Sequence, residues 1–414
     1  MIIIYLCYVL ALWLWTSSSV SQDNAVYFTY FYLVIGMALS GLAVFAVWYK
    51  HKNLQVGPII ALALVNIGAS ISFRMGETYV KSYQEDFVCM VMVFGAVFLL
   101  VRYTKLYRMK LLNILCVAAL PLILYYTAFF SEEVNGSHLY FFGIMTIGII
   151  LAGYPFAVAT FMASPETQYR KGNVRNLSLN MTSFLLYTLL LFGGCAFCNE
   201  YGMLLVLAMT ATVIFFIRCN NWITKIMFST ACMAGALVVS KVVSHVHDRV
   251  TIWLNLKAAV HDERLAEKAE TALYLFRNFK RMGFYGNGIG NLPESIYRTL
   301  HSDHVLVTIL NDYGVFIAIF IALLGALFVR WMLMEGPNMN VYDKYLNLCS
   351  ALIVGFVILI HVASNLASFI TAGLGYPWCS DGTSANLMFT VLMAVHCGII
   401  GRRDKRELQE RYKK

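Results

Sequence analysis

Long apolar runs recur along the whole chain and constrain its fold more than any other feature. A helix needs roughly 20 consecutive apolar residues to cross a bilayer, and about twelve such runs are present. They lie near 1–20, 27–49, 56–74, 86–103, 111–130, 138–162, 179–197, 201–218, 222–244, 305–330, 346–369 and 385–401. Hydrophobic residues make up 60% of the chain and charged residues only 13%, unlike a soluble domain. The sequence therefore predicts an all-α polytopic integral membrane protein with about twelve transmembrane helices.

The charged residues between the runs predict how the helices cross the membrane. Basic loops alternate with acidic or neutral loops, and the positive-inside rule places the basic ones in the cytoplasm. We therefore expect both termini in the cytoplasm, with run 1–20 retained as a helix rather than cleaved as a signal peptide. The net charge of +9 needs no nucleic-acid partner, since no basic face on a soluble domain is present. The basic groups are Lys50-His51-Lys52, Arg102 to Lys110, Arg170-Lys171 with Arg175, Arg218 with Lys225, and the tail 402–414.

One connection, residues 245–303, is much longer than the others, and the alternation places it on the extracytoplasmic side. Its charged segment has the pattern of a short amphipathic helix. This helix could rest at the bilayer surface or belong to an ordered functional loop, and both explanations stay open. Its expected apolar side is Ala269, Ala272, Leu273, Leu275 and Phe276.

The ten cysteines show no spacing typical of zinc ligands. Cys195-Ala196-Phe197-Cys198 is an isolated C-x-x-C pair without a surrounding βαβ pattern. This context favours free cysteines packed in helices over a redox pair.

An ionisable cluster lies where a loop enters an apolar run. A glycine-rich turn precedes His301-Ser302-Asp303-His304, and the run begins at Val305. A carboxylate at the mouth of a membrane helix is costly, and partial desolvation makes it a better base. Two explanations stay open for Asp303, because Asp is also a preferred helix N-cap residue.

Three parts of the sequence resemble the SEDS family, the RodA-, FtsW- and SpoVE-like polytopic glycosyltransferases of bacterial cell-wall synthesis. The family has a G-G-x-x-G-x-G turn, then H-T-D-F and E-E-x-G, and it has the loop G-L-P-L-P-F-x-S-Y-G-G-S before its last helix. The matching residues are Met282 to Gly288, His301-Ser302-Asp303, Asn311-Asp312-Tyr313-Gly314 and Gly373 to Ser384, with weaker matches at Asn199 to Gly202 and Arg249 to Asn255.

The resemblance implies a peptidoglycan glycosyltransferase that polymerises lipid II at the outer face of the cytoplasmic membrane, in elongation, division or shape control. It places the general base at Asp303 and implies a class B penicillin-binding protein, a transpeptidase, as partner. It also implies a core over 179–401, after helices in 1–178 that include an extra pair, and before the basic tail 402–414.

Further side chains are candidates for binding the substrate. Arginine binds phosphate bidentately, and glycine-rich backbone can cradle it, although lipid anchoring and a plain turn are equally simple explanations. A divalent cation could share this role, but no metal-ligand set is found, and a zinc site at the two histidines would need a third ligand. The candidates are Arg249, Gly286, Gly288, Arg298, His301, Ser380, Asp381 and Ser384.

The chain also departs from the family pattern. Glu270-Thr271 stands where the family has a tyrosine-glutamine pair, and Asp381-Gly382-Thr383 replaces Tyr-Gly-Gly. These departures keep a changed substrate or a non-catalytic cell-wall scaffold open. Two other functions also stay open: an O-antigen-type polymerase or ligase using polyprenyl-diphosphate-linked sugars, and a lipid II flippase.

Overall fold

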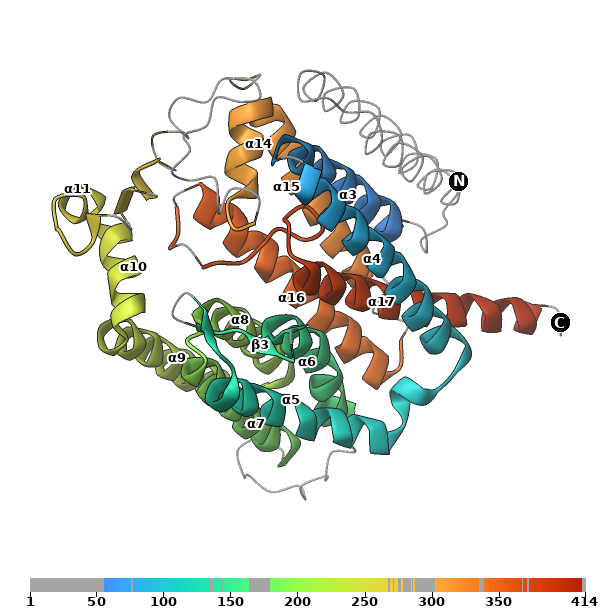
Figure 1. Cartoon of the computed structure of the whole chain (residues 1–414). Helices are drawn as coiled ribbons and strands as arrows, with labels where there is room; N and C mark the ends of the chain where they lie inside the picture. Colours follow the sequence, from blue (N-terminus) through green and yellow to red (C-terminus); the bar gives the residue numbers. More distant parts are fainter. Residues whose placement is uncertain are drawn as a thin grey trace. The chain divides into compact units, whose positions relative to one another are not determined.

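The computed structural model is built almost entirely of helices (Figure 1). It describes residues 56–75, 77–134, 137–142, 144–163, 179–266, 269–270, 272–274, 277, 284, 286, 302–334, 339–366, 368–370 and 372–411. The chain divides into two compact units, and both are assembled from segments that are distant in the sequence. The first consists of 1–109, 281–337 and 374–414, and the second of 110–280 and 338–373.

The first unit is organised around helix α4 (Glu77–Tyr103), which packs along α17 (Thr383–Arg411) (Figure 1). Helix α3 (Val56–Met75) packs on α4 and on α15 (Val315–Met334), and the short α14 (Val305–Tyr313) precedes α15. A 3₁₀ turn, η3 (Leu106–Arg108), follows α4. Large aromatic side chains fill the core, with the ring of Trp378 4.8 Å from that of Phe328 and 5.8 Å from that of Phe389.

The second unit contains the middle of the chain together with α16 (Val341–Asn365), which packs on α6 (Thr146–Ala163) and α8 (Tyr201–Arg218). Helix α5 (Lys110–Phe130) packs on α6 and on α7 (Leu179–Phe197). The remaining helices of this unit are α9 (Trp222–Val242), α10 (Ser244–Leu254) and α11 (Leu256–Ala259).

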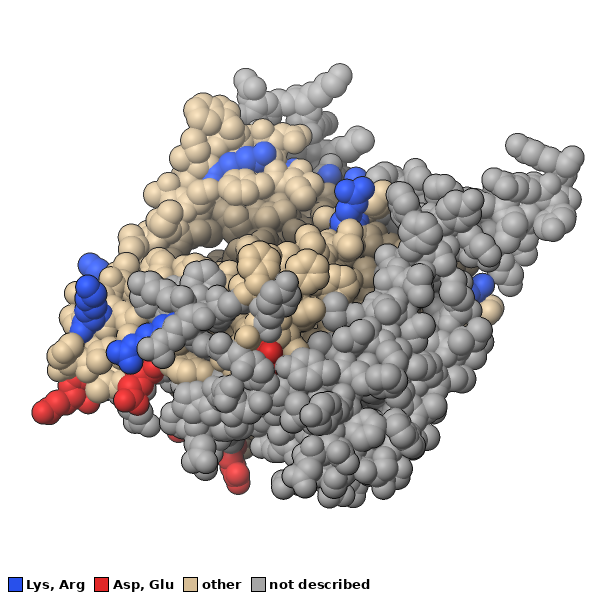
Figure 2. All heavy atoms as spheres, turned by 90° about the horizontal axis from the view of Figure 1, so that it is seen from above, with Lys and Arg blue, Asp and Glu red and all other residues tan. Residues whose placement is uncertain are grey.

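The described residues contain eight helices that are long and apolar enough to cross a membrane, and two shorter apolar helices. Each apolar run between 56 and 401 contains a helix. Helix α9 has no buried residue, which suits a helix that faces lipid. Most of the described surface visible in Figure 2 carries no charged side chain. The all-α integral membrane fold is therefore confirmed. Runs 1–20 and 27–49 lie outside the described residues, so the total of twelve helices stays a prediction.

Two of the expected helices differ from the structure. Run 138–162 becomes helical only at Thr146, because two antiparallel hairpins precede it. Their strands are β1 (Glu133–Val134) with β2 (Ser137–His138), and β3 (Tyr140–Phe141) with β4 (Ile144–Met145). The first hairpin is held by a hydrogen bond from the His138 N–H to the Cys198 carbonyl, 3.0 Å long. Run 305–330 is divided at Gly314 into α14 and α15, where the backbone has φ +84°.

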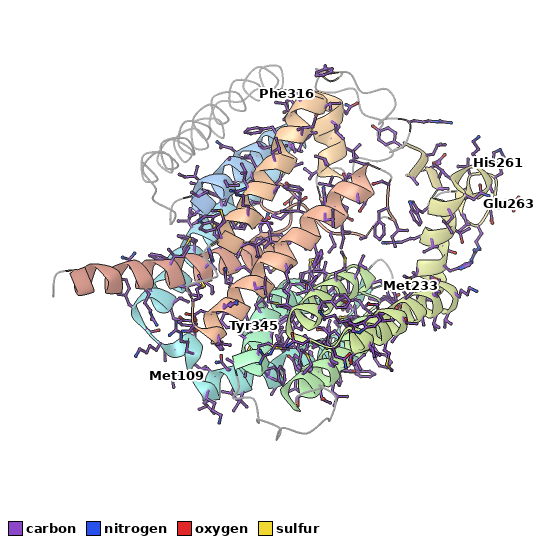
Figure 3. All side chains as sticks on the ribbon, turned by 180° about the vertical axis from the view of Figure 1, so that it is seen from behind. Met109, Met233, His261, Glu263, Phe316 and Tyr345 are labelled. Carbon is purple, nitrogen blue, oxygen red and sulfur yellow. The ribbon has the colours of Figure 1, made fainter. Side chains whose placement is uncertain are left out.

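The segment after α9 has a small apolar core of its own. Buried Ile252, Ala259, Leu265 and Ala269 pack together, with Ala272 beside them. The apolar side expected for the amphipathic segment thus packs, at Ala269 and Ala272, on α10 and α11. His261 and Glu263 are exposed at the tip of the segment (Figure 3). Its assignment to the outer side of the membrane stays a prediction.

Candidate active site

Asp303 lies in the turn that leads into α14, and it is half-buried. Helix α14 begins at Val305, as the sequence predicts. Its N-cap residue is His304, which makes no side-chain capping hydrogen bond. Asp303 lies one residue before the assigned cap position, so the capping and base explanations both stay open.

The loop before the last helix is bonded directly to this turn. The Ser380 hydroxyl donates a hydrogen bond to the Ser302 carbonyl, 2.7 Å away, and accepts one from the Tyr376 N–H at 2.6 Å. Ser380 is 4% exposed. A hydroxyl has one hydrogen to donate, and here it is used within the protein. Ser380, expected as a substrate contact, thus connects two of the matching stretches next to Asp303.

Several further hydrogen bonds fix the shape of the same loop. The Trp378 N–H donates to Asn386 Oδ1 at 2.9 Å, and its indole N–H donates to Thr390 Oγ1 at 3.1 Å. The Tyr83 hydroxyl donates to the Trp378 carbonyl at 2.6 Å, and the Tyr376 hydroxyl donates to the Ile321 carbonyl at 2.8 Å. These hydrogen bonds make the loop rigid, so it can hold Ser380 in place beside the Asp303 turn.

The glycine-rich turn and the end of α14 approach each other closely. A Cβ on Gly286 would lie 2.6 Å from the Asp312 carbonyl oxygen, and one on Gly314 would lie 2.2 Å from the Phe284 oxygen. Both glycines have positive φ, +72° and +84°. Gly286, expected as a phosphate contact, therefore has a packing role that already requires glycine. Beside it, the Asn311 amide donates to Asp312 Oδ1 at 3.0 Å, and both side chains are buried.

Asp86 lies beside the start of α17, and the sequence analysis did not select it as a candidate. The Thr383 hydroxyl donates to Asp86 Oδ1 at 2.6 Å, and Asp86 is 7% exposed. The half-buried Asp381 is close enough for its negative charge to act on Asp86. The sequence signal for it is a carboxylate at the start of the apolar run 86–103.

Of the remaining candidate residues, the structure describes Arg249 and Ser384. Arg249 is half-buried on α10, in the second unit, and Ser384 is half-buried in the first turn of α17. Gly288, Arg298 and His301 lie outside the described residues.

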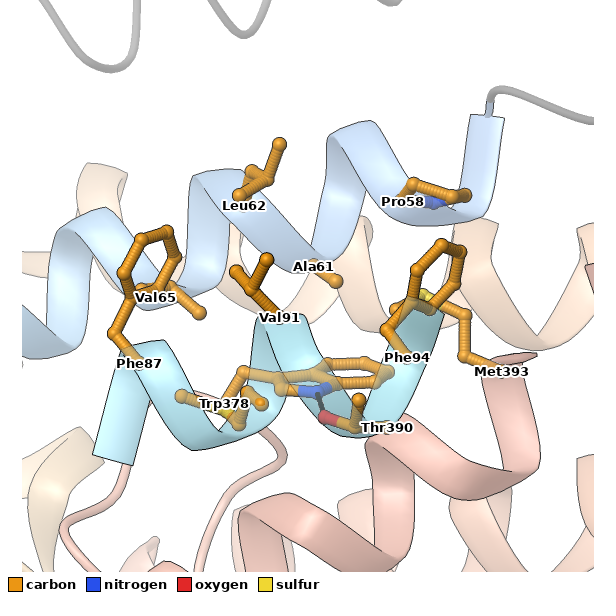
Figure 4. A pocket seen from close by; sticks show the side chains of 11 residues that line it. Pro58, Ala61, Leu62, Val65, Phe87, Val91, Phe94, Trp378, Thr390 and Met393 are labelled. Atoms are coloured by element: carbon orange, nitrogen blue, oxygen red, sulfur yellow. Dashed lines mark hydrogen bonds between the residues drawn. The ribbon is translucent and has the colours of Figure 1, made fainter. Parts of the chain in front are cut away.

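An apolar cavity of about 90 Å³ opens between α3, α4 and α17 of the first unit (Figure 4). Its wall includes Pro58, Val91, Phe94, Trp378 and Met393. The loop that holds Ser380 thus reaches this cavity through Trp378.

The two cysteines of the C-x-x-C pair are packed in the protein interior. Cys195 and Cys198 are free and buried. Burial and the nearby charge of Glu200 raise the pKa of Cys198 to about 12, which disfavours the thiolate that redox chemistry needs.

Comparison with known proteins identifies the family. A family model described as "Cell cycle protein", for FtsW, RodA and SpoVE, matches residues 54–404. A Coxiella burnetii protein named "Probable peptidoglycan glycosyltransferase FtsW" is 24% identical over 292 residues, covering 67% of this chain and 75% of the relative.

Two solved structures share the fold. A chain from "Structural coordination of polymerization and crosslinking by a peptidoglycan synthase complex" matches with a TM-score of 0.65 at 16% identity, over 83% of this chain and 96% of that one. Thermus thermophilus rod shape determining protein RodA matches with a TM-score of 0.55 at 15% identity, over 84% and 96% of the two chains. The chain therefore belongs to the FtsW/RodA/SpoVE family, the SEDS proteins, and is a multi-pass protein of the inner membrane.

Proposed function

We propose that the protein is a peptidoglycan glycosyltransferase that polymerises lipid II, with Asp303 as general base. The observation that carries this proposal is the hydrogen bond from Ser380 to the Ser302 carbonyl. It joins two family-like stretches at the residue that precedes Asp303. A base has to be held in place, and this bond restrains the turn that carries the carboxylate.

The reaction assigns a defined task to that carboxylate. A sugar hydroxyl of one lipid II attacks the anomeric carbon of the lipid-linked glycan, so a new C–O bond forms. The bond from that carbon to the diphosphate breaks, and polyprenyl diphosphate leaves. Asp303 accepts the hydroxyl proton, an assistance worth about two to four powers of ten in rate. Arg249 is our candidate for binding the diphosphate, by the resemblance of its stretch to the family and by bidentate phosphate recognition.

Lipid II polymerisation by the purified protein tests the role of Asp303. Asp303→Asn keeps the size of the side chain and can still cap a helix, but it cannot accept the proton. We expect normal insertion into the membrane and a rate lower by about two to four powers of ten. Asp262→Asn is the matched control, because Asp262 is an exposed carboxylate that accepts a backbone hydrogen bond from Arg264, which Asn can also accept.

The outcomes separate the alternatives. An Asp303→Asn protein that polymerises at more than about a tenth of the parent rate has a different base. If capping is the role, Asp303→Asn stays active, and Asp303→Ala loses about 1 kcal/mol of stability. A parent protein that is inactive alone and with a transpeptidase partner favours the scaffold. Transport of lipid II without polymerisation favours the flippase, and polymerisation of a different lipid-linked sugar favours the O-antigen-type enzyme.

A further inference from the structure

Two arginines meet where α4 and α17 leave their apolar spans. The span in α4 ends at Tyr103 and the span in α17 ends at Arg402, so both ends lie at one membrane–water boundary. There, Arg402 Nε donates a hydrogen bond to the carbonyl of Arg102, 3.2 Å away. A Cβ on Gly401 would lie 3.3 Å from Arg102 Nη1, so the Arg102 side chain packs tightly against α17. The absence of a larger side chain at position 401 makes room for this guanidinium.

Aromatic rings hold both guanidinium groups in place. The central carbon of the Arg102 guanidinium is 5.4 Å from the Phe98 ring and 5.5 Å from the Tyr103 ring. Arg402 is 5.4 Å from the ring of Tyr107, and Arg108 is 5.2 Å from the same ring. Stacking on aromatic faces restricts the long side chains, so less entropy is lost when they bind a ligand.

Within the described part of the chain, neither guanidinium forms an ion pair. Arg102 Nε and Arg402 Nη1 are buried and have no hydrogen-bond partner. The ion pair between Arg264 and Asp248 lies on other elements. An arginine that merely reaches the membrane surface keeps its head in water. Arg102 and Arg402 are half-buried instead, and a buried cationic nitrogen without a partner is costly.

We propose that Arg102 and Arg402 bind the phosphate of an anionic phospholipid between the ends of α4 and α17. The guanidinium fork matches phosphate oxygens bidentately, and basic pockets between membrane helices on the cytoplasmic side bind such headgroups. Leu106 and Met109 in the adjoining turn are exposed, 41% and 44%, and offer apolar surface for acyl chains. The site is separate from the turn of Asp303 and does not depend on the proposed reaction.

Binding of dioleoyl phosphatidylglycerol to the purified full chain in detergent tests the proposal. Native mass spectrometry gives the occupancy, and titration gives the Kd. We expect saturable binding of one lipid, and a Kd raised about tenfold in Arg102→Gln and in Arg402→Gln, as expected for one lost charge-assisted contact. Arg330→Gln is the matched control, because Arg330 is exposed on α15 near the end that the predicted topology places on the same side. Its Kd should change less than about twofold.

Three results would overturn the site. The first is phosphatidylglycerol binding with the parent Kd in the folded double variant. The second is equal affinity for dioleoyl phosphatidylcholine, which would show that anionic charge is not recognised. The third is equal affinity for inorganic phosphate, which would show a free-anion site instead of a lipid site.

If a glutamine variant fails to fold, Arg102→Lys and Arg402→Lys keep the positive charge but lose the bidentate fork of the guanidinium. Their Kd should still rise, and an unchanged Kd would equally contradict the bidentate site.

Discussion

Ser380 donates a hydrogen bond to Ser302, 78 positions away in the sequence, and its hydroxyl also accepts one from the Tyr376 N–H. This changes the role that we assign to it. A serine that contacts substrate would mainly affect substrate binding. A serine that restrains the turn of Asp303 would mainly affect the chemical step.

We therefore predict that Ser380→Ala lowers kcat for polymerisation and leaves KM nearly unchanged. The Ser302 carbonyl and the Tyr376 N–H lose a buried partner, so stability should fall by about 1–3 kcal/mol. Lipid II titrations and thermal unfolding of the purified variant measure both effects. Ser368→Ala is the control, since the exposed Ser368 hydroxyl also donates to a backbone carbonyl. A raised KM at unchanged kcat would instead indicate that Ser380 contacts the substrate.

At the scale of elements, the break between α14 and α15 follows from one glycine. The apolar run continues on both sides of Gly314, so composition alone predicts a single helix. The backbone turns at Gly314 with φ +84°, and the Phe284 carbonyl approaches the space that a Cβ would occupy. The break lets the backbone at Gly286 pack onto the end of α14.

Gly314→Ala should therefore be strongly destabilising, by more than about 3 kcal/mol, because the new Cβ would meet backbone atoms in an unfavourable conformation. Gly95→Ala is the matched control, because nothing lies within 4 Å of a Cβ at this helical position of α4. Alanine there should be neutral or stabilising by up to about 1 kcal/mol. Thermal unfolding in detergent compares the two, and similar melting temperatures would contradict the steric argument.

The contrast between predictable and unpredictable elements has a physical origin. Long apolar runs give membrane helices whatever the partner, so α5, α8 and α9 were predictable from the sequence alone. The hairpins before Thr146 and the break at Gly314 depend on tertiary contacts, which no local pattern reports. Likewise, a polar cluster at the start of a helix indicated the Asp303 turn. The hydrogen bond from Ser380 to the Ser302 carbonyl and the one from Thr383 to Asp86 join distant segments, so no local pattern indicates them.

At the scale of the whole molecule, the chain does not divide at a single point. The first unit combines α3 and α4 with α14, α15 and α17, while the second contains the middle of the chain and α16. The candidate base belongs to the first unit, and Arg249 belongs to the second. The family match begins at residue 54, and the additional pair of helices expected before it lies outside the described residues and stays a prediction.

The topology is testable by cysteine labelling in whole cells. Asp262 and Lys105 are exposed, and we place them on opposite sides of the membrane. Asp262→Cys should react with an impermeant maleimide in intact cells, whereas Lys105→Cys should react only after permeabilisation. The parent protein gives the background from its native cysteines. Labelling of position 262 only after permeabilisation would invert the proposed orientation.

The same topology predicts where a transpeptidase partner binds. We propose a class B penicillin-binding protein, because strand polymerisation and cross-linking act on the same product at the outer face. Its contact should involve outer loops and membrane helices, so deletion of Glu407–Lys414 should leave co-purification unchanged. A bulky label attached to the Asp262→Cys variant adds mass to the exposed tip beyond α11 and should weaken the complex. If the truncated protein loses the partner while the labelled one retains it, the contact is cytoplasmic and this placement is wrong.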